Sequence, residues 1–248
     1  MLKTDNRRRD EALDALKWLA LLSMVLDHLR YVGLSLDWLY VPGRLAFPWF
    51  CLAMAVNLTR ARVETDRRPG PWRYLGWLLL FSLLSEIPYR LFIPDPDTLN
   101  VLPTLALGLL VARGWQQRRG VAMALGLVAL LLALGFSRWL MFGAFGVLLP
   151  LALLLVLRRP WYFSLLPGAL CLAANQWETL FPAARLGNPV ATCGIAVCLL
   201  APWLGVMLLR GLRGLRGLRG GSVPAMRRWA YLLYPAHFLL LLALRQLL

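Results

Sequence analysis

Charged residues are scarce in this sequence, and acidic residues and histidines are especially few. Only 16% of its 248 residues are charged, whereas 60% are hydrophobic, and this balance is too apolar for an ordinary water-soluble domain. A transmembrane helix needs about 20 apolar residues, so a chain of this length has room for about eight or nine such helices. The composition therefore predicts a membrane protein and leaves no length for a separate soluble domain.

The sequence also lacks the spacing of a metal site or of a cleaved leader. Its four cysteines lie inside apolar stretches, without a CxxC pair or a mixed Cys/His pattern. We therefore expect buried cysteines with no redox role, and no bound metal. The first apolar run ends at Asp27 and His28, with no small-residue cleavage site after it, so we expect it to be retained as a helix. The cysteines are Cys51, Cys171, Cys193 and Cys198.

Long apolar stretches predict an all-α fold: a polytopic bundle of transmembrane helices that forms one integral membrane domain over residues 1–248. Two of the stretches, 99–113 and 161–175, are short for a crossing, and we expect them to be re-entrant or strongly tilted. The predicted spans, about nine in number, are 17–36, 39–58, 74–93, 99–113, 120–136, 139–157, 161–175, 189–209 and 229–247.

Lysine and arginine, which number 27, are concentrated between the apolar stretches, and the net charge is +15. Basic loops favour the cytoplasmic face, so the pattern predicts a cytoplasmic N-terminus and a C-terminus on the opposite side. The segment 210–228, which contains RGLRGLRGLRGG, is predicted to be a flexible cytoplasmic loop that touches lipid headgroups. The alternative is that its arginines hold an anionic ligand. We expect membrane lipids, and no nucleic acid, as partners of these charges.

Several ionisable residues lie inside the predicted spans, where their cost makes each a candidate functional residue. Asp27 and His28 lie near the middle of the first span, and His237 lies in the last. Neighbours on a helix point about 100° apart, so Asp27 and His28 each need a partner on another helix. Glu86 and Arg90 are spaced to form an ion pair within one helix, which is the structural alternative for them. His237 could likewise serve only to bind a backbone carbonyl.

The second span is interrupted by prolines and glycine, and it contains Arg44. A broken helix at membrane depth is tolerated where it lines a cavity or is buried in protein. The fragment 43–48 is therefore predicted to form a cavity wall in which Arg44 meets an anionic group. The alternative is a proline kink with an arginine that extends toward the membrane surface.

Three of these segments together resemble the TraX family, the membrane proteins of conjugative plasmids that N-acetylate pilin, and their chromosomal relatives. A looser likeness covers 85–89 and 100–102, and residues 106–228 add only hydropathy. The sequence lacks the long N-terminal extension of the conjugative members, which leaves the acceptor open. The three motifs are Leu22-Ser23-Met24-Val25-Leu26-Asp27-His28, Gly43-Arg44-Leu45-Ala46-Phe47-Pro48 through Asn57-Leu58-Thr59-Arg60, and Tyr234-Pro235-Ala236-His237.

The resemblance implies an acetyltransferase of the bacterial inner membrane that moves an acetyl group from acetyl-CoA to an amine. The amine would be the N-terminus of a pilin or of another membrane-inserted protein. The expected catalytic residues are His28, Asp27 and His237. The residues expected to bind substrate or CoA are Arg44, Asn57, Arg60, Glu86, Arg90 and Asn100.

Chemistry suggests individual roles for the catalytic residues. An imidazole has a reference pKa of about 6.5, which suits a general base, so we assign that role to His28. Asp27 would orient a cation, either Arg44 or the incoming amine, and His237 would be a second base or an oxyanion donor. Arg44 falls in the outer half of the predicted threading, far from cytoplasmic acetyl-CoA. Basic residues of the cytoplasmic loops are better placed for its phosphates: Arg60, Arg62, Arg113 and Arg119.

Two other functions fit the same residues. Buried charges and broken helices also mark proton-coupled transporters, although the internal repeats common in that class are not evident here. A membrane O-acyltransferase would keep the chemistry and replace the amine by a hydroxyl of a lipid or polysaccharide.

Overall fold

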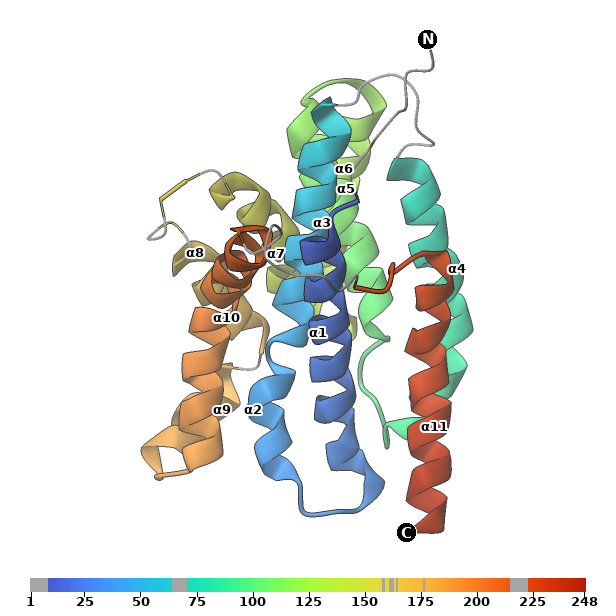
Figure 1. The fold of residues 1–248 in the computed structure, drawn as a ribbon, viewed down its shortest axis with the longest axis vertical. Helices are drawn as coiled ribbons and strands as arrows, with labels where there is room; N and C mark the ends of the chain where they lie inside the picture. Colours follow the sequence, from blue (N-terminus) through green and yellow to red (C-terminus); the bar gives the residue numbers. More distant parts are fainter. Residues whose placement is uncertain are drawn as a thin grey trace.

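The computed structural model describes residues 9–63, 71–157, 159–160, 163, 165–175, 177–214 and 223–248. Every regular element within these ranges is a helix, as predicted for an all-α fold (Figure 1). The N-terminal elements are α1 Glu11–His28, η1 Leu29–Val32, η2 Asp37–Leu39, α2 Tyr40–Gly43, α3 Ala46–Val63 and α4 Pro71–Phe92. Those that follow are α5 Val101–Gln117, α6 Gly120–Gly135, η3 Ser137–Trp139, α7 Gly143–Val156, α8 Leu165–Ala174, α9 Trp177–Arg185, α10 Pro189–Gly214, η6 Arg228–Leu232 and α11 Leu233–Leu247.

The first helix begins and ends earlier than the predicted span 17–36. The Asp10 carboxylate accepts a hydrogen bond from the backbone N–H of Leu13 at 3.2 Å and so caps the start of α1. The 3-10 turn after α1 ends at Gly33, whose φ of 97° suits a residue without a side chain. The predicted boundaries were wrong because they followed hydropathy, whereas the capping residue sets where the helix starts.

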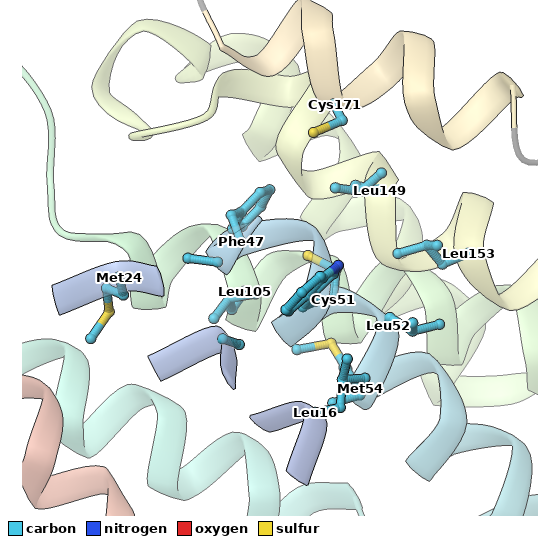
Figure 2. Packing of buried hydrophobic residues seen from close by; sticks show 14 of the residues in the cluster. Leu16, Met24, Phe47, Cys51, Leu52, Met54, Leu105, Leu149, Leu153 and Cys171 are labelled. Atoms are coloured by element: carbon cyan, nitrogen blue, oxygen red, sulfur yellow. The ribbon is translucent and has the colours of Figure 1, made fainter. Parts of the chain in front are cut away.

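The predicted break in the second span is present, because residues 44 and 45 form a turn between α2 and α3. The segment Asp37–Arg60 has 67% of its most apolar window buried inside the protein, against 22% for Arg228–Leu247. Helix α3 is therefore the central helix of the bundle, and α11 lies at its edge (Figure 1). Figure 2 shows the core around α3, where Leu52 and Cys51 pack with Leu16 of α1 and Leu149 of α7.

Small residues allow the close packing that membrane helices favour. At the contact of α5 with α6, a Cβ atom on Gly114 would lie 3.0 Å from Cα of Gly126 and 2.9 Å from the carbonyl oxygen of Ala122. The two backbones therefore touch at this point, and a larger side chain would force the helices apart.

Among the described residues, four helical segments are long and apolar enough to cross a membrane: Asp37–Arg60, Trp72–Phe92, Pro189–Gly214 and Arg228–Leu247. Gly120–Gly135, Gly143–Val156 and Leu165–Ala174 are shorter apolar helices. These apolar helices indicate a multi-pass membrane protein. The count of about nine spans and the orientation stay predictions. Helix α8, which corresponds to 161–175, has 10 residues, or about 15 Å at 1.5 Å per residue, half of a typical hydrocarbon core.

The connection between the predicted spans 161–175 and 189–209 contains a helix that hydropathy did not predict. In α9, Leu180 is buried whereas Glu178 is exposed, so the helix is amphipathic and packs one face on α10. It was missed because the segment is short and interrupted by Pro182.

Helix ends that border basic connections lie in the upper half of Figure 1: the ends of α3, α5 and α10 and the starts of α4 and α6. Arg60 and Arg213 both pair with Asp10, so the ends of α3 and α10 meet the start of α1 there. The predicted flexible loop 210–228 needs a correction, because α10 continues to Gly214. The Arg213–Asp10 ion pair, 2.7 Å long, fixes the first part of that segment as helix. Residues 215–222 of the loop lie outside the described residues.

Candidate active site

A cavity of about 230 Å³ lies between α1, α3, α4, α5 and the start of α11. Its walls are mainly apolar, and Met24, Phe47 and Leu105, which contribute to them, are labelled in Figure 2. Its polar residues lie at two levels. The deep level has Asp27, His28, Gly43, Arg44 and Asn175, and the outer level has Lys17, Asn57 and Arg227.

Arg44 anchors the deep end of the cavity. Its guanidinium group donates to Oδ2 of Asp27 at 2.7 Å and to Oδ1 of Asn175 at 2.6 Å. Its Nε donates to the backbone carbonyl of Tyr40, and its charge lies 4.1 Å from the centre of the Tyr40 ring. With only 12% of its side chain exposed, Arg44 is held inside the protein and does not extend toward the surface, as the alternative had it.

Close approach of two backbones seats Asp27 against Arg44. A Cβ atom on Gly43 would lie 2.5 Å from both Cβ and Oδ1 of Asp27, so only glycine fits at this position. Ser23, one helical turn before Asp27, donates to the carbonyl of Pro42 at 2.6 Å and ties α1 to the same segment. The proline and glycine that break the second span therefore create the place for the Asp27 carboxylate.

The two histidines of the chain meet across α1 and α11. Nδ1 of His28 lies 2.7 Å from Nε2 of His237, and the two rings are stacked with an angle of 14° between them. Nδ1 of His237 lies 3.2 Å from the carbonyl oxygen of Leu233. His237 is 7% exposed and is not part of the cavity wall, whereas His28 is.

The hydrogen-bond pattern assigns the protons of this pair. A carbonyl oxygen only accepts, so Nδ1 of His237 carries a proton and its Nε2 is the acceptor. The proton between the rings then belongs to Nδ1 of His28. Nε2 of His28 is left with a lone pair, so His28 is the histidine equipped to take a proton from a molecule in the cavity.

The outer end of the cavity reaches the basic end of the bundle. Lys17 precedes Asp27 by ten positions in α1, which is about 15 Å along a helix. Asn57 and Arg227 line the cavity and are exposed, so the cavity meets the surface between α3 and η6. Tyr231, on the same side, stacks on Phe81 with ring centres 5.4 Å apart. The cavity thus connects the basic end with the level of Arg44, which the predicted threading puts in the outer half of the membrane.

The arginines predicted for CoA phosphates lie apart from one another. Arg60 pairs with Asp10, Arg113 stacks 4.1 Å above the ring of Trp72, and Arg119 is exposed. The side chain of Arg62 lies outside the described residues. None of the three described arginines lines the cavity, whereas Lys17 and Arg227 do.

Asp10 carries a charge that its arginine partners stabilise. Burial alone would raise the pKa of its carboxyl group. The hydrogen bond from Arg213 and the positive charges of Arg213 and Arg60 outweigh that effect and lower the pKa below its usual value. The ionised carboxylate is therefore the form that holds the start of α1 to the ends of α3 and α10.

Glu86, Arg90 and Asn100 form a separate group, which we call the α4–α5 clamp. Arg90 donates to Glu86 at 2.7 Å, the ion pair that their spacing allows. Glu86 also accepts from the side-chain amide of Asn100 at 2.7 Å and from its backbone N–H at 3.1 Å. Asn100 in turn caps α5 through Leu102. The three residues are not part of the cavity wall, so their contacts are those of a structural link between two helices.

Sequence reasoning missed two residues of the site. Asn175 ends the apolar stretch 161–175, donates to the carbonyl of Cys171 and accepts from Arg44. Arg30 lies 3.2 Å from Oδ1 of Asp27, just after α1. The available signal for Asn175 was a polar residue at the end of an apolar stretch, and for Arg30 it was a charge inside the predicted span 17–36. We use the term polar cluster for Asp27, His28, Arg44, Asn175 and His237. Within the described part of the chain, no group of three or more His, Cys, Asp or Glu is placed to hold a metal ion.

Comparison with known proteins places the chain in a family. Residues 12–245 match the profile described as "TraX protein". A curated protein called "Protein TraX", from Escherichia coli, is 36% identical over 80 residues, which are 32% of this chain and 29% of that protein. That similarity spans less than a third of the relative's length, and no solved structure gives a significant match. Because the profile covers nearly the whole sequence, the chain belongs to the TraX family.

Proposed function

We propose that this protein is an acetyltransferase of the bacterial inner membrane that moves an acetyl group from acetyl-CoA to an amine. The observation that carries the proposal is the pairing of His28 with His237 at the wall of a cavity. Acyl transfer to an amine needs a base with access to the substrate, and Nε2 of His28 has the free lone pair for this role. Family membership supports the same chemistry.

The amine attacks the thioester carbonyl with its lone pair, forming a C–N bond. Nε2 of His28 takes the proton that the amine loses, and the cation that results is stabilised through Nδ1–H by His237. When the tetrahedral intermediate collapses, the C–S bond breaks, and the CoA thiolate receives the proton from His28. His237 touches His28 rather than the substrate, so it is a positioning residue.

Arg44 is suited to support the negative oxygen of the intermediate. A guanidinium group has five N–H donors, and Arg44 uses them to bond Asp27, Asn175 and the carbonyl of Tyr40. Donors therefore remain for an oxygen in the cavity, and their fixed position costs no reorganisation when charge develops. Asp27 holds Arg44 and could in turn accept an N–H of the amine.

Acetyl-CoA would enter at the basic end. Lys17 and Arg227 line the outer cavity and could bind its phosphates, with Asn57 beside them, while Arg60 lies nearby on α3. The narrow thioester arm would then reach about 15 Å inward along α1 to His28. The acceptor that we propose is the N-terminus of a pilin or of another membrane-inserted protein.

Labelled acetyl-CoA and an amine peptide, incubated with the purified protein, test the proposal. We expect His28→Ala to lower the rate of acetyl transfer by about 10²–10⁴-fold. His237→Phe should lower kcat without changing KM for acetyl-CoA, and His237→Gln should restore part of the rate because its amide oxygen accepts from His28. Leu239→Ala, an exposed position on the same helix as His237, is the matched control.

Three outcomes would contradict the assignment. Transfer by His28→Ala at the wild-type rate would overturn the role of His28 as the base. Transfer to lipid or polysaccharide hydroxyls instead of amines would favour an O-acyltransferase. No binding of acetyl-CoA, together with proton-coupled solute flux in liposomes, would favour a transporter.

A further inference from the structure

A second hollow lies at the other end of the molecule from the basic connections. It is an open groove of about 840 Å³ between the end of α1, α2, α9 and the start of α10. In Figure 1, α2, α9 and the start of α10 lie together at the lower left. The cavity instead reaches the surface at Asn57 and Arg227, which border the basic connections. The groove is lined by Arg30, Asp37, Tyr40, Ala183, Asn188 and Ala191, among others.

One layer of side chains separates the groove from the deep end of the cavity. Asp27 and Arg44 line the cavity, whereas Arg30 and Tyr40 line the groove. Arg30 lies 3.2 Å from Asp27, and its charge lies 5.0 Å from the Tyr40 ring. Arg44 stacks on the same Tyr40 ring at 4.1 Å. The two hollows therefore face each other across four contacting residues.

Asp27 is incompletely satisfied within this layer. Its Oδ2 accepts a hydrogen bond from Arg44, whereas its buried Oδ1 forms an ion pair with Arg30 at 3.2 Å but accepts no hydrogen bond from the described residues. A buried carboxylate oxygen without a hydrogen bond is costly, so it favours a donor that arrives with a ligand. The N–H of an amine is such a donor.

The size of the cavity argues that the two substrates enter separately. At about 230 Å³ it is smaller than the roughly 300–1,000 Å³ of pockets that hold a whole drug-sized ligand. The thioester arm of acetyl-CoA would fill it and leave no room for a polypeptide terminus. The groove is open and carries the exposed carboxylate of Asp37, which attracts a protonated amine. The amine gives its extra proton to solvent in the open groove before it reacts, so it reaches the thioester as a neutral nucleophile.

We propose that the groove admits the acceptor amine, so that acetyl-CoA and the amine reach the polar cluster from opposite ends of the molecule. This inference rests on the proposed acetyl transfer. Movement of Arg30 and Tyr40 opens the layer, the amine binds Oδ1 of Asp27, and its nitrogen attacks the thioester carbonyl beside His28. The proton goes to His28 and then to the CoA thiolate, so the acetyl group alone passes from the cavity side to the groove side.

Sealed proteoliposomes test this arrangement directly. An impermeant peptide with a free N-terminal amine is trapped inside, acetyl-CoA is added outside, and peptide acetylation is measured by mass spectrometry. We expect acetylation in this arrangement, from the molecules whose basic end faces outward. With both substrates outside, we expect little acetylation. Acetylation only when both are on the same side would overturn the inference and leave the acetyltransferase in place. No transfer in liposomes or in detergent would reject the proposed function itself.

A variant that fills the groove gives an independent test. Ala183→Trp places a large ring in the groove, and Ala196→Trp, at an exposed position of α10 outside it, is the matched control. We expect Ala183→Trp to lower peptide acetylation at least about tenfold, because it blocks the approach of one reactant. Binding of acetyl-CoA, measured by calorimetry, should not change in either variant. Acetylation by Ala183→Trp at the control rate would contradict the inference.

Discussion

The polar cluster and the α4–α5 clamp both place charged side chains inside apolar helices, but they draw their partners from different distances along the chain. In the polar cluster, Arg44 and Asn175 are 131 residues apart, and His28 and His237 are 209 residues apart. In the clamp, Glu86 contacts Arg90 and Asn100, which are 4 and 14 residues away. The first group assembles only when the whole bundle folds, and the second forms between consecutive helices.

The difference separates two uses of charge in a membrane helix. Every member of the clamp is satisfied by its neighbours, and none faces the cavity. In the polar cluster, one carboxylate oxygen of Asp27 has an ion pair with Arg30 but no hydrogen bond, and His28 keeps a lone pair, beside an open space. A charge inside an apolar stretch is therefore a weak indicator of a site by itself, and unsatisfied bonding capacity beside a cavity is a stronger one.

The largest effect that would sharpen this contrast is on the reaction rate. His28→Ala should lower kcat for acetyl transfer by about 10²–10⁴-fold, the usual contribution of a general base. The double variant with His237→Ala should be no slower, because His237 acts only through His28. Single-turnover acetylation of a peptide measures both. Rate losses that multiply in the double variant would show that His237 acts on its own.

The next effect is on stability in the polar cluster. Arg44→Ala leaves the Asp27 carboxylate buried without its main partner, and such a change costs about 3–5 kcal/mol. We expect unfolding in a denaturant titration to occur at a clearly lower concentration than for wild type. Asp27→Asn combined with Arg44→Leu should recover part of the loss. Equal stability of Arg44→Ala and wild type would mean that this ion pair does not hold α1 to the broken helix.

In the clamp, a substitution should change the stability of the protein and leave the rate of acetyl transfer unchanged. Glu86→Ala removes the acceptor of the backbone N–H of Asn100 and of one of its side-chain N–H groups. An unsatisfied buried group costs about 1–3 kcal/mol. Acetyl transfer per folded molecule should stay at the wild-type level. Glu86→Gln, which keeps one acceptor oxygen, is the matched control and should be milder. A specific loss of kcat in Glu86→Ala would move Glu86 into the catalytic site.

The smallest effect is the pH dependence of the stability that Asp10 contributes at the start of α1. The folded-state pKa of Asp10 is lowered, so its stabilisation is complete at pH values above its unfolded-state pKa and is lost as pH falls through the folded value. At neutral pH, Asp10→Asn should reduce stability by about 1 kcal/mol, because its arginine partners are partly exposed. The difference from wild type should vanish in acid. Asparagine also caps a helix, so the cap on α1 is kept in this variant. A difference that persists in acid would contradict the ion pairs of Asp10 as the cause.

Local sequence patterns predicted most of the helices, whereas the site is formed by contacts between residues that are far apart in the sequence. The apolar stretches predicted the helices, and Pro42 and Gly43 predicted the break in the second span. The spacing of Glu86 and Arg90 predicted their ion pair. The start of α1, the extension of α10 and the existence of α9 were missed because they depend on Asp10 and on packing. A hydropathy pattern contains no information on the capping by Asp10 or on packing between helices.

The site was predicted one residue at a time, without its geometry. Asp27, His28, Arg44 and His237 were selected because each is costly in a membrane, and the structure brings all four together. Arg44 was one of the two cations predicted for Asp27, and the structure contains that pair. The pairing of His28 with His237 was not predicted, because it depends on how α1 and α11 pack. Asn175 escaped for the same reason, since an asparagine at the end of an apolar stretch is equally compatible with a surface loop.

Gly43 makes the site sensitive to a very small substitution. The place occupied by the Asp27 carboxylate is the volume that a methyl group on Gly43 would fill. Gly43→Ala would remove no charge, no base and no hydrogen-bond donor, yet it would displace the carboxylate from its arginine. What matters at position 43 is the space left for the Asp27 carboxylate, and a search for reactive side chains would not find it. It is encoded by the absence of a side chain, and a change of one carbon atom is enough to erase it.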